Sequence, residues 1–110
     1  MKKYKKAPKI VQDIFNFEWK RTKRMCKPFF NSIQKPRLYV AKILKHGWLG
    51  YHSRRIRGDM IVIRESHLNS PDLLNTIRHE ICHAVYHNHK RKFQTMLRGL
   101  NEKAPSPENA

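Results

Sequence analysis

The sequence predicts a small α+β domain, and three observations lead to that fold class. The chain has 110 residues, which is enough for one hydrophobic core but not for two. Three stretches repeat apolar residues at intervals of three and four, as amphipathic helices do. Three short runs of β character lie between the first and second of these stretches. We therefore expect an N-terminal helix, a three-stranded antiparallel sheet, a second helix and a C-terminal helix.

The N-terminal region is expected to contain a basic arm and one long helix. Residues 1–9 are rich in lysine and include Pro8, which favours a flexible arm. From about Lys9 to Cys26, apolar residues such as Ile14 and Trp19 recur with helical spacing. The folded domain is expected to span residues 10–100. Residues 101–110 contain two prolines and no large apolar residue, which predicts a disordered tail.

Three runs have the composition of β-strands, namely 37–44, 47–53 and 59–64. Turn signals that contain glycine separate these runs at 46–47 and 57–59. Because strands that follow one another in the chain usually pair, we expect a meander of three antiparallel strands.

The second helix has a well-marked start and two different faces. The segment 70–72 supplies a capping serine, a proline for the first helical position and an acid for the first turn. Its apolar residues cover one arc of the helix, whereas His79, His83 and Thr76 fall on the opposite side. We expect the first face to pack on the core and the second to line a cleft. A last helix should run from about residue 90 to 100.

His79, Glu80 and His83 form the pattern H-E-x-x-H, which is typical of a zinc site on a helix. Residues four apart lie on the same helix face with Cβ atoms about 5–6 Å apart, which suits two imidazoles that bind one Zn²⁺. Glu80 lies about 100° further round the helix, where its carboxylate can act on a water molecule at the metal. His79 and His83 are therefore candidate metal ligands, and Glu80 is a candidate general base.

A catalytic zinc needs three protein ligands and one open place for water, so a third ligand is expected. The candidates are His87 and His89. On an unbroken helix His87 would lie about 12 Å along the axis from His79, which is too far for three rings to meet. Asn88 tolerates the left-handed conformation that ends helices, and a turn there would bring His89 back to the metal. This reasoning favours His89.

The segment 77–84, followed by Asn88, His89 and Phe93, resembles the SprT-like zinc metallopeptidases and the related YgjP-like metallopeptidases. The resemblance extends over residues 10–100 and is specific over 79–93. It implies a zincin-type domain with one Zn²⁺, in which three histidines are the metal ligands and Glu80 is the catalytic acid/base. It also implies an enzyme that hydrolyses peptide bonds in proteins bound or crosslinked to DNA.

The chain carries 24 Lys and Arg against 8 Asp and Glu, a net charge of +16, which favours polyanionic partners. Nucleic acid is the first expectation and an anionic membrane surface the second. No transmembrane or signal-peptide segment is evident, so we expect a cytoplasmic protein, associated with DNA or the nucleoid. The basic residues predicted to contact nucleic acid are Lys20, Arg21, Lys23, Arg24, Arg54, Arg55, Arg57, Lys90, Arg91 and Lys92.

The main hypothesis is thus a zinc metallopeptidase with Glu80 as general base. Two alternatives are a basic nucleic-acid-binding module with a structural or vestigial zinc, and an interaction protein that grips its partner by charge. The sequence does not distinguish Zn²⁺ from Mn²⁺. A donor for the transition-state oxyanion is also expected, with the candidates Tyr51, His52, His67 and Tyr86.

Overall fold

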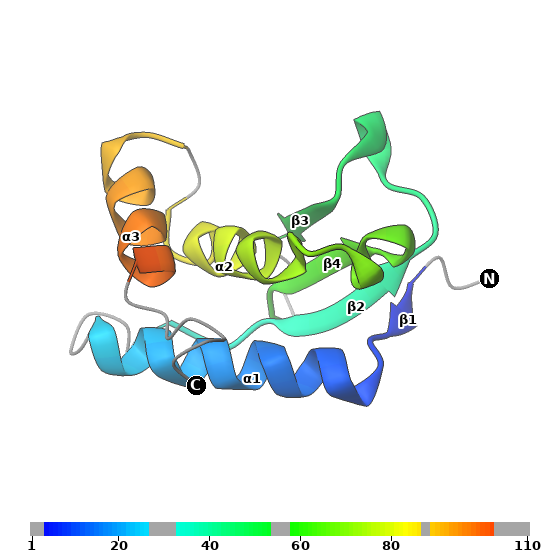
Figure 1. Cartoon of the computed structure of the whole chain (residues 1–110), viewed down its shortest axis with the longest axis horizontal. Helices are drawn as coiled ribbons and strands as arrows, with labels where there is room; N and C mark the ends of the chain where they lie inside the picture. Colours follow the sequence, from blue (N-terminus) through cyan, green and yellow to red (C-terminus); the bar gives the residue numbers. More distant parts are fainter. Residues whose placement is uncertain (1–3, 27–32, 54–57, 87–88, 103–110) are drawn as a thin grey trace.

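The computed structural model describes residues 4–26, 33–53, 58–86 and 89–102, and in them it confirms the α+β class. Helices and strands are drawn in chain order in Figure 1, with α3 at the opposite end of the molecule from β1. The elements are β1 (Lys5–Lys6), α1 (Lys9–Met25), β2 (Arg37–Ala41), η2 (Lys45–Gly47), β3 (Gly50–Ser53), β4 (Met60–Arg64), η3 (Glu65–Asn69), α2 (Leu73–His83) and α3 (Arg91–Glu102), where η marks a 3₁₀ helix.

Helix α1 forms where the apolar spacing predicts it. It begins directly after Pro8 and buries one face, on which Val11, Phe15 and Trp19 lie one turn apart. Lys23 and Arg24 occupy the last turn, where positive charge is favourable beside the unpaired carbonyl groups of the helix. The opposite face is in solvent.

The prediction of a three-stranded antiparallel sheet is wrong. Four strands form a mixed sheet in the order β1-β2-β4-β3, with β2 parallel to β4 and β3 antiparallel to β4. Residues Met60 to Ile63 are an unbroken apolar run and are all buried, so β4 takes the central place that such a run favours. All residues of β3 are only half-buried, which suits an edge strand.

The basic arm predicted over residues 1–9 contributes to the sheet. Lys5 pairs with Val40 and Lys6 with Tyr39, so β1 is an antiparallel edge strand next to β2. Ala7 is buried in the core directly before α1. A two-residue strand of lysines is a short, charged edge, which discourages pairing with other chains. Asn101 and Glu102, the first two residues of the predicted tail, are instead the last residues of α3. Residues 1–3 and 103–110 lie outside the described residues.

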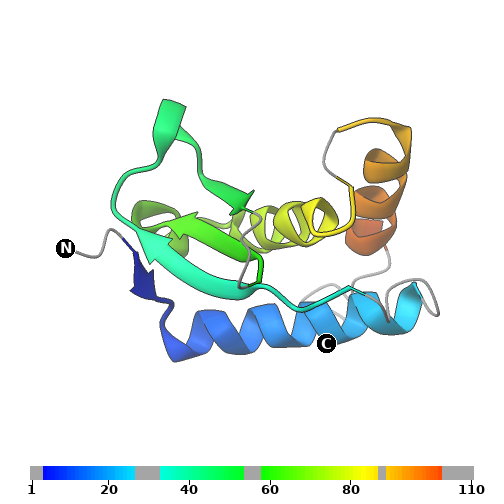
Figure 2. The same ribbon diagram turned by 180° about the vertical axis from the view of Figure 1, so that it is seen from behind.

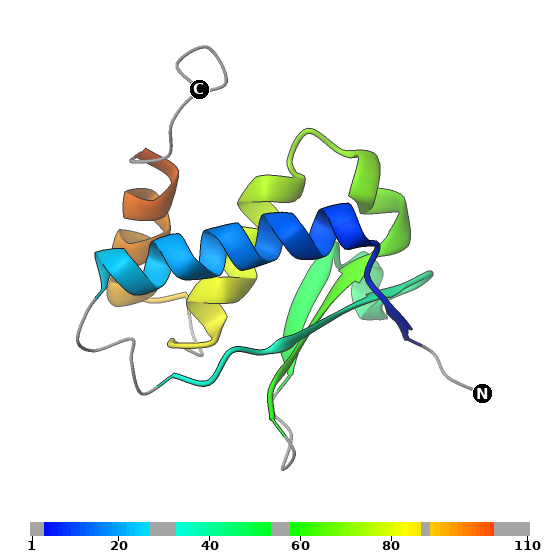
Figure 3. The same ribbon diagram turned by 90° about the horizontal axis from the view of Figure 1, so that it is seen from below.

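The main core lies between one face of the sheet and the helices α1 and α2. Leu38, Val40, Ile61 and Ile63 alternate along β2 and β4 and point to this side, as the two-residue period of strands requires. Figure 3 shows α1 crossing over α2 in front of the strands. A smaller cluster of Cys82, Phe93 and Leu100 joins α3 to the end of α2. Among the described residues, no helix is both long and apolar enough to span a membrane.

A buried ionic network connects the three helices. Glu18 of α1 accepts hydrogen bonds from Arg21 at 2.8 Å and from Arg78 of α2 at 2.9 Å, both to its Oε1 atom. Arg21 also donates to the carbonyl of Leu100 at 2.7 Å, and Arg78 donates to Asn101 Oδ1 at 3.1 Å, both at the end of α3. Buried charges are stable only when they are paired in this way. The network therefore fixes α2 against its two neighbouring helices.

We expect Glu18→Gln to lower the free energy of unfolding by about 3–5 kcal/mol, because it leaves two buried arginines without their counter-charge. Burial raises the pKa of Glu18, but the bonds from Arg78 and Arg21 outweigh this effect and hold it below 4.5. The stabilisation is therefore present above pH 4.5 and lost as the pH falls through the lower, folded-state pKa. Urea denaturation at neutral and acidic pH measures both effects. The matched control is Asp13→Asn on the exposed side of α1, and equal stability of the two variants would contradict the prediction.

Candidate metal centre

Three imidazoles converge at one end of α2. His79 and His83 lie one turn apart on the helix, and His89 comes from the segment before α3. The Nε2 atom of His89 is 3.1 Å from that of His79 and 2.9 Å from that of His83. Donor atoms of all three residues lie within 4.8 Å of one another, so the group could hold a metal ion.

The three imidazoles can converge because α2 ends at the second histidine of the cluster. The helix ends at His83, and the amide of Tyr86 donates to the carbonyl of Cys82 at 2.8 Å in the turn that follows. The chain then returns towards the helix before α3 begins at Arg91. The sequence places the turn later, at Asn88, whereas the helix already ends at His83. The alternative ligand His87, and Asn88 with it, lie outside the described residues.

The spacing of the nitrogen atoms fits a small tetrahedral cation. Zinc–nitrogen bonds of about 2.0–2.1 Å place two tetrahedral nitrogen ligands about 3.3 Å apart. The two observed separations, 2.9 and 3.1 Å, are close to this value. Three protein ligands leave the fourth tetrahedral place free, as in catalytic rather than structural zinc sites.

Contacts with neighbouring residues orient the imidazole rings of the cluster. His83 Nδ1 lies 3.1 Å from the carbonyl oxygen of Tyr86, which can only accept, so Nδ1 carries the proton and Nε2 keeps its lone pair. Phe93 of α3 is fully buried beneath the cluster. Its ring centroid lies 4.9, 4.6 and 4.9 Å from those of His79, His83 and His89. Phe93 thus limits the rotation of all three rings.

Burial keeps the imidazoles of His79 and His83 neutral at neutral pH. Burial is the main cause that lowers the pKa of His83 to about 4; the hydrogen bond to the Tyr86 carbonyl opposes it, and the nearby rings of His79, His89 and His52 add to it. Burial, and then the electrostatic interaction with His89, also lower the pKa of His79. A neutral imidazole with a free lone pair is the form that binds a metal ion.

Glu80 has an unusual position for a carboxylate. It is only 4% exposed, and its Oε1 atom has no hydrogen-bond partner among the described residues. Burial raises the pKa of Glu80 to about 8. A buried carboxylate without a partner is costly, and a cation nearby would favour its charged form. These features fit a proton acceptor that faces a metal site.

Other residues predicted to act at the site have different partners. The Tyr86 side chain lines a separate hollow, although its backbone carbonyl orients His83. The remaining candidates for an oxyanion donor form contacts at Tyr51 Oη–Tyr4 Oη (2.7 Å), His52 Nε2–Asp59 Oδ2 (2.9 Å) and His67 Nε2–Thr76 Oγ1 (2.7 Å).

The basic residues predicted to contact nucleic acid have different environments. Arg21 is buried in the ionic network, so its assignment to a nucleic-acid surface is wrong. It faces inwards because its position on α1 is next to Glu18 on the buried side. Arg54, Arg55 and Arg57 lie outside the described residues. The exposed members of the set are Lys20, Lys23, Arg24, Lys90, Arg91 and Lys92.

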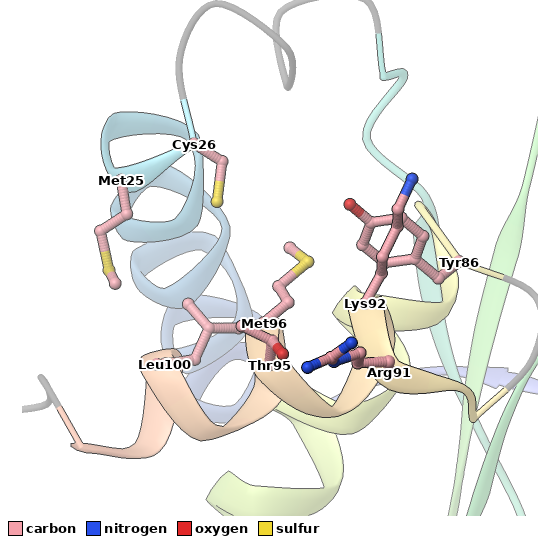
Figure 4. Close-up of a pocket in the computed structure, with 9 residues that line it drawn as sticks. Met25, Cys26, Tyr86, Arg91, Lys92, Thr95, Met96 and Leu100 are labelled. Atoms are coloured by element: carbon pink, nitrogen blue, oxygen red, sulfur yellow. The ribbon is translucent and has the colours of Figure 1, made fainter.

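Two hollows are relevant to the site. One of about 240 Å³ adjoins the cluster and is lined by His79 and Glu80 together with residues of β3 and the segment before it. A larger one, of about 580 Å³, lies between the end of α1 and α3, with Met96, Leu100 and Tyr86 on its walls (Figure 4). Neither Glu80 nor the three histidines line the larger hollow, whereas His79 and Glu80 both line the smaller one.

No family model, curated protein or solved structure matches this chain.

Two contributors to the site carry no signal in the sequence. The first is the backbone carbonyl of Tyr86, since any residue at that position would supply it. The second is Gly50, where a Cβ atom would lie 3.1 Å from the Thr76 side chain. Gly50 therefore allows β3 to approach α2 closely, beside the glutamate of the site.

We expect the purified protein to bind one Zn²⁺ per chain through the three histidines, because their nitrogen atoms already converge. Removing one ligand with His89→Ala should weaken binding by more than the roughly 10–100-fold that loss of an outer hydrogen bond costs. Metal analysis and competition with a chromophoric chelator measure stoichiometry and affinity. The control is His46→Ala, since His46 is exposed and outside the cluster. Equal zinc affinity of the two variants would exclude His89 as a ligand.

Proposed function

We propose that this protein is a zinc-dependent metallopeptidase of the SprT-like type, which hydrolyses peptide bonds in proteins associated with DNA. The observation that carries the proposal is Glu80, a buried carboxylate without a partner among the described residues, next to three convergent imidazoles. A purely structural zinc would take four protein ligands and would have no use for a carboxylate beside it. Three ligands with an adjacent base are the arrangement that hydrolysis needs.

Each residue has a defined part in the proposed reaction. His79, His83 and His89 would hold the metal through their Nε2 atoms. A bound zinc supplies Lewis acidity, which makes water a better nucleophile and polarises the scissile carbonyl. Glu80 accepts one proton from the attacking water and passes it to the nitrogen of the leaving amine, so that its carboxylate is regenerated. Burial raises the pKa of Glu80 to about 8, and the positive charge of a bound cation would lower it again, which favours the carboxylate that accepts the proton.

The edge of the sheet offers a place for the substrate backbone. Within the described part of the chain, β3 is an edge strand, paired with β4 on one side only. Gly50 brings it against Thr76, which lies one helical turn before Glu80. An extended peptide can add to such an edge through backbone hydrogen bonds, largely independently of its sequence. A peptide in that position would pass along the face of α2 that carries the catalytic residues.

The second candidate is a basic nucleic-acid-binding module in which the zinc is structural or vestigial. The net charge of +16 and the exposed basic residues on α1 and at the start of α3 favour nucleic acid as a partner in either case. They do not account for the buried carboxylate. The peptidase includes both observations and is therefore preferred. An interaction protein that uses charge alone accounts for neither the imidazoles nor Glu80.

We expect Glu80→Gln to retain zinc but to lower the cleavage rate of a DNA-bound protein by about 10²–10⁴-fold, because the amide cannot accept a proton. The measurement combines metal analysis with gel-based cleavage of a basic protein in the presence of DNA. Glu65→Gln is the control, since Glu65 is an exposed carboxylate in η3. Unchanged cleavage by Glu80→Gln would reject the assigned base. A zinc-loaded wild type that cleaves nothing would support the binding module.

We expect binding to duplex DNA to weaken steeply with salt, because exposed Lys and Arg side chains displace counterions from phosphates. Replacing Lys20, Lys23 and Arg24 by alanine should reduce the slope of log K against log salt by about 0.9 for each phosphate that the variant no longer neutralises. Fluorescence anisotropy with labelled duplex over a salt series measures the slope. The control is Lys9→Ala at the start of α1, where Lys9 already pairs with Asp13. An unchanged slope in the triple variant would place the DNA-binding surface elsewhere.

A further inference from the structure

The hollow next to Glu80 has walls of mixed character. Its volume is about 240 Å³. Trp48, Leu49 and Gly50 form one side, whereas α2 forms the other, which ends at the catalytic glutamate. The α2 residues that line it are Asn75, Thr76, His79 and Glu80. Among the residues that the structure describes, no lysine or arginine lines this hollow.

The size of the hollow restricts its occupant. Sites for whole small molecules usually have volumes of about 300–1,000 Å³. A space of about 240 Å³ is below that range and suits one large side chain. Because the hollow adjoins His79 and Glu80, a side chain inside it would belong to a residue close to the bond that is cleaved.

Trp48 and Leu49 are large apolar residues that remain half in solvent. Each is 47% exposed, although both lie directly before β3 at the rim of the hollow. They belong to the connection between β2 and β3, which projects above the sheet in Figure 2. The centroid of the Trp48 ring lies 5.4 Å from that of His46 and 6.2 Å from that of Tyr51. Trp48 thus belongs to a group of neighbouring aromatic rings that is partly exposed to solvent.

We propose that Trp48 and Leu49 form a specificity subsite that takes a large apolar or aromatic side chain next to the scissile peptide bond. The proposal rests on the proposed peptidase function and names the substrate feature that the enzyme selects. Burial of such a side chain against the indole ring and Leu49 removes apolar surface from water on both partners. An acidic side chain would meet the carboxylate of Glu80, and the described walls of the hollow offer no lysine or arginine to compensate.

A nucleobase stacked on Trp48 is the competing occupant. Proteins that stack bases combine aromatic rings with cations that follow the phosphate backbone. The described residues place no such cation on the walls of the hollow, and its far end is the catalytic glutamate. The arrangement therefore favours a substrate side chain over a base.

The test compares two peptides in the zinc-loaded full chain, one with Phe and one with Ala at the residue flanking the cleaved bond. Wild type should prefer the Phe peptide. Trp48→Ala should lower kcat/KM for the Phe peptide by about 10–100-fold and for the Ala peptide by much less, whereas Trp48→Phe should keep most of the preference. The matched control is Ile43→Ala, a residue on the same connection that is 79% exposed and does not line the hollow. An unchanged preference in Trp48→Ala, or a preference for charged residues, would overturn the proposal.

A second readout separates failure of the subsite from failure of the peptidase. The chain has two tryptophans, and Trp19 is only 5% exposed, so quenching by a soluble quencher reports mainly on Trp48. In zinc-loaded Glu80→Gln protein, the Phe peptide should shield Trp48 and the Ala peptide should not. Shielding without cleavage by wild type would retain the subsite and reject the peptidase. Shielding by oligothymidylate but not by the Phe peptide would show a base-stacking surface and overturn the proposal.

Discussion

The buried ion pair between Glu18 and Arg78 is the contact on which the geometry of the site depends. Arg78 directly precedes His79 on α2, and its guanidinium is fixed at 2.9 Å from a carboxylate of α1. The same arginine reaches Asn101 at the end of α3. Arg78 therefore connects α2, which carries His79 and His83, to α3, which begins shortly after His89. The Nε2 atom of His89 can lie 3.1 Å from that of His79 and 2.9 Å from that of His83 only if the mutual orientation of the helices is fixed in this way.

The histidine side of α2 follows from the sequence because it depends on local periodicity. Positions 79 and 83 share a face in any α-helix, whereas the end of the helix at His83 comes earlier than the turn predicted at Asn88. The order of the strands depends instead on which strand is most fully buried, and turn signals do not report this property. For the same reason charge alone assigns Arg21 to the surface, although its partner Glu18 lies one turn before it on the buried side. Glu18 and Arg21 are close in the sequence, but this pair is buried together with Arg78, which lies 60 residues from Glu18, and no local pattern shows that contact.

Burial has opposite effects on the pKa values of the two kinds of titratable group in the site. It lowers the pKa of His79 and His83, which keeps their nitrogen lone pairs free for a metal. It raises the pKa of Glu80 to about 8, so that the carboxyl group is largely protonated at neutral pH until a cation nearby favours its charged form. In the metal-free protein the same burial leaves Glu80 Oε1 without a partner among the described residues, which opposes folding. Metal binding at the histidines would offset part of this cost, because an ion that binds only the folded state stabilises it.

β3 lies at the edge of the sheet, whereas the expected meander would put it in the centre. This position determines which residues and which open strand edge lie beside the candidate metal centre. In a meander the run around residues 48–51 would be the central strand, with both of its edges paired. In the observed order β4 is central, so one edge of β3 is left without a strand partner among the described residues, beside α2. Trp48 and Leu49, at the start of that edge, then line the hollow that ends at Glu80. A peptide that pairs with β3 would place alternate side chains towards this hollow, because side chains alternate along an extended chain. If a peptide binds there as proposed, strand order rather than any single residue would couple the backbone contact to the selection of a side chain.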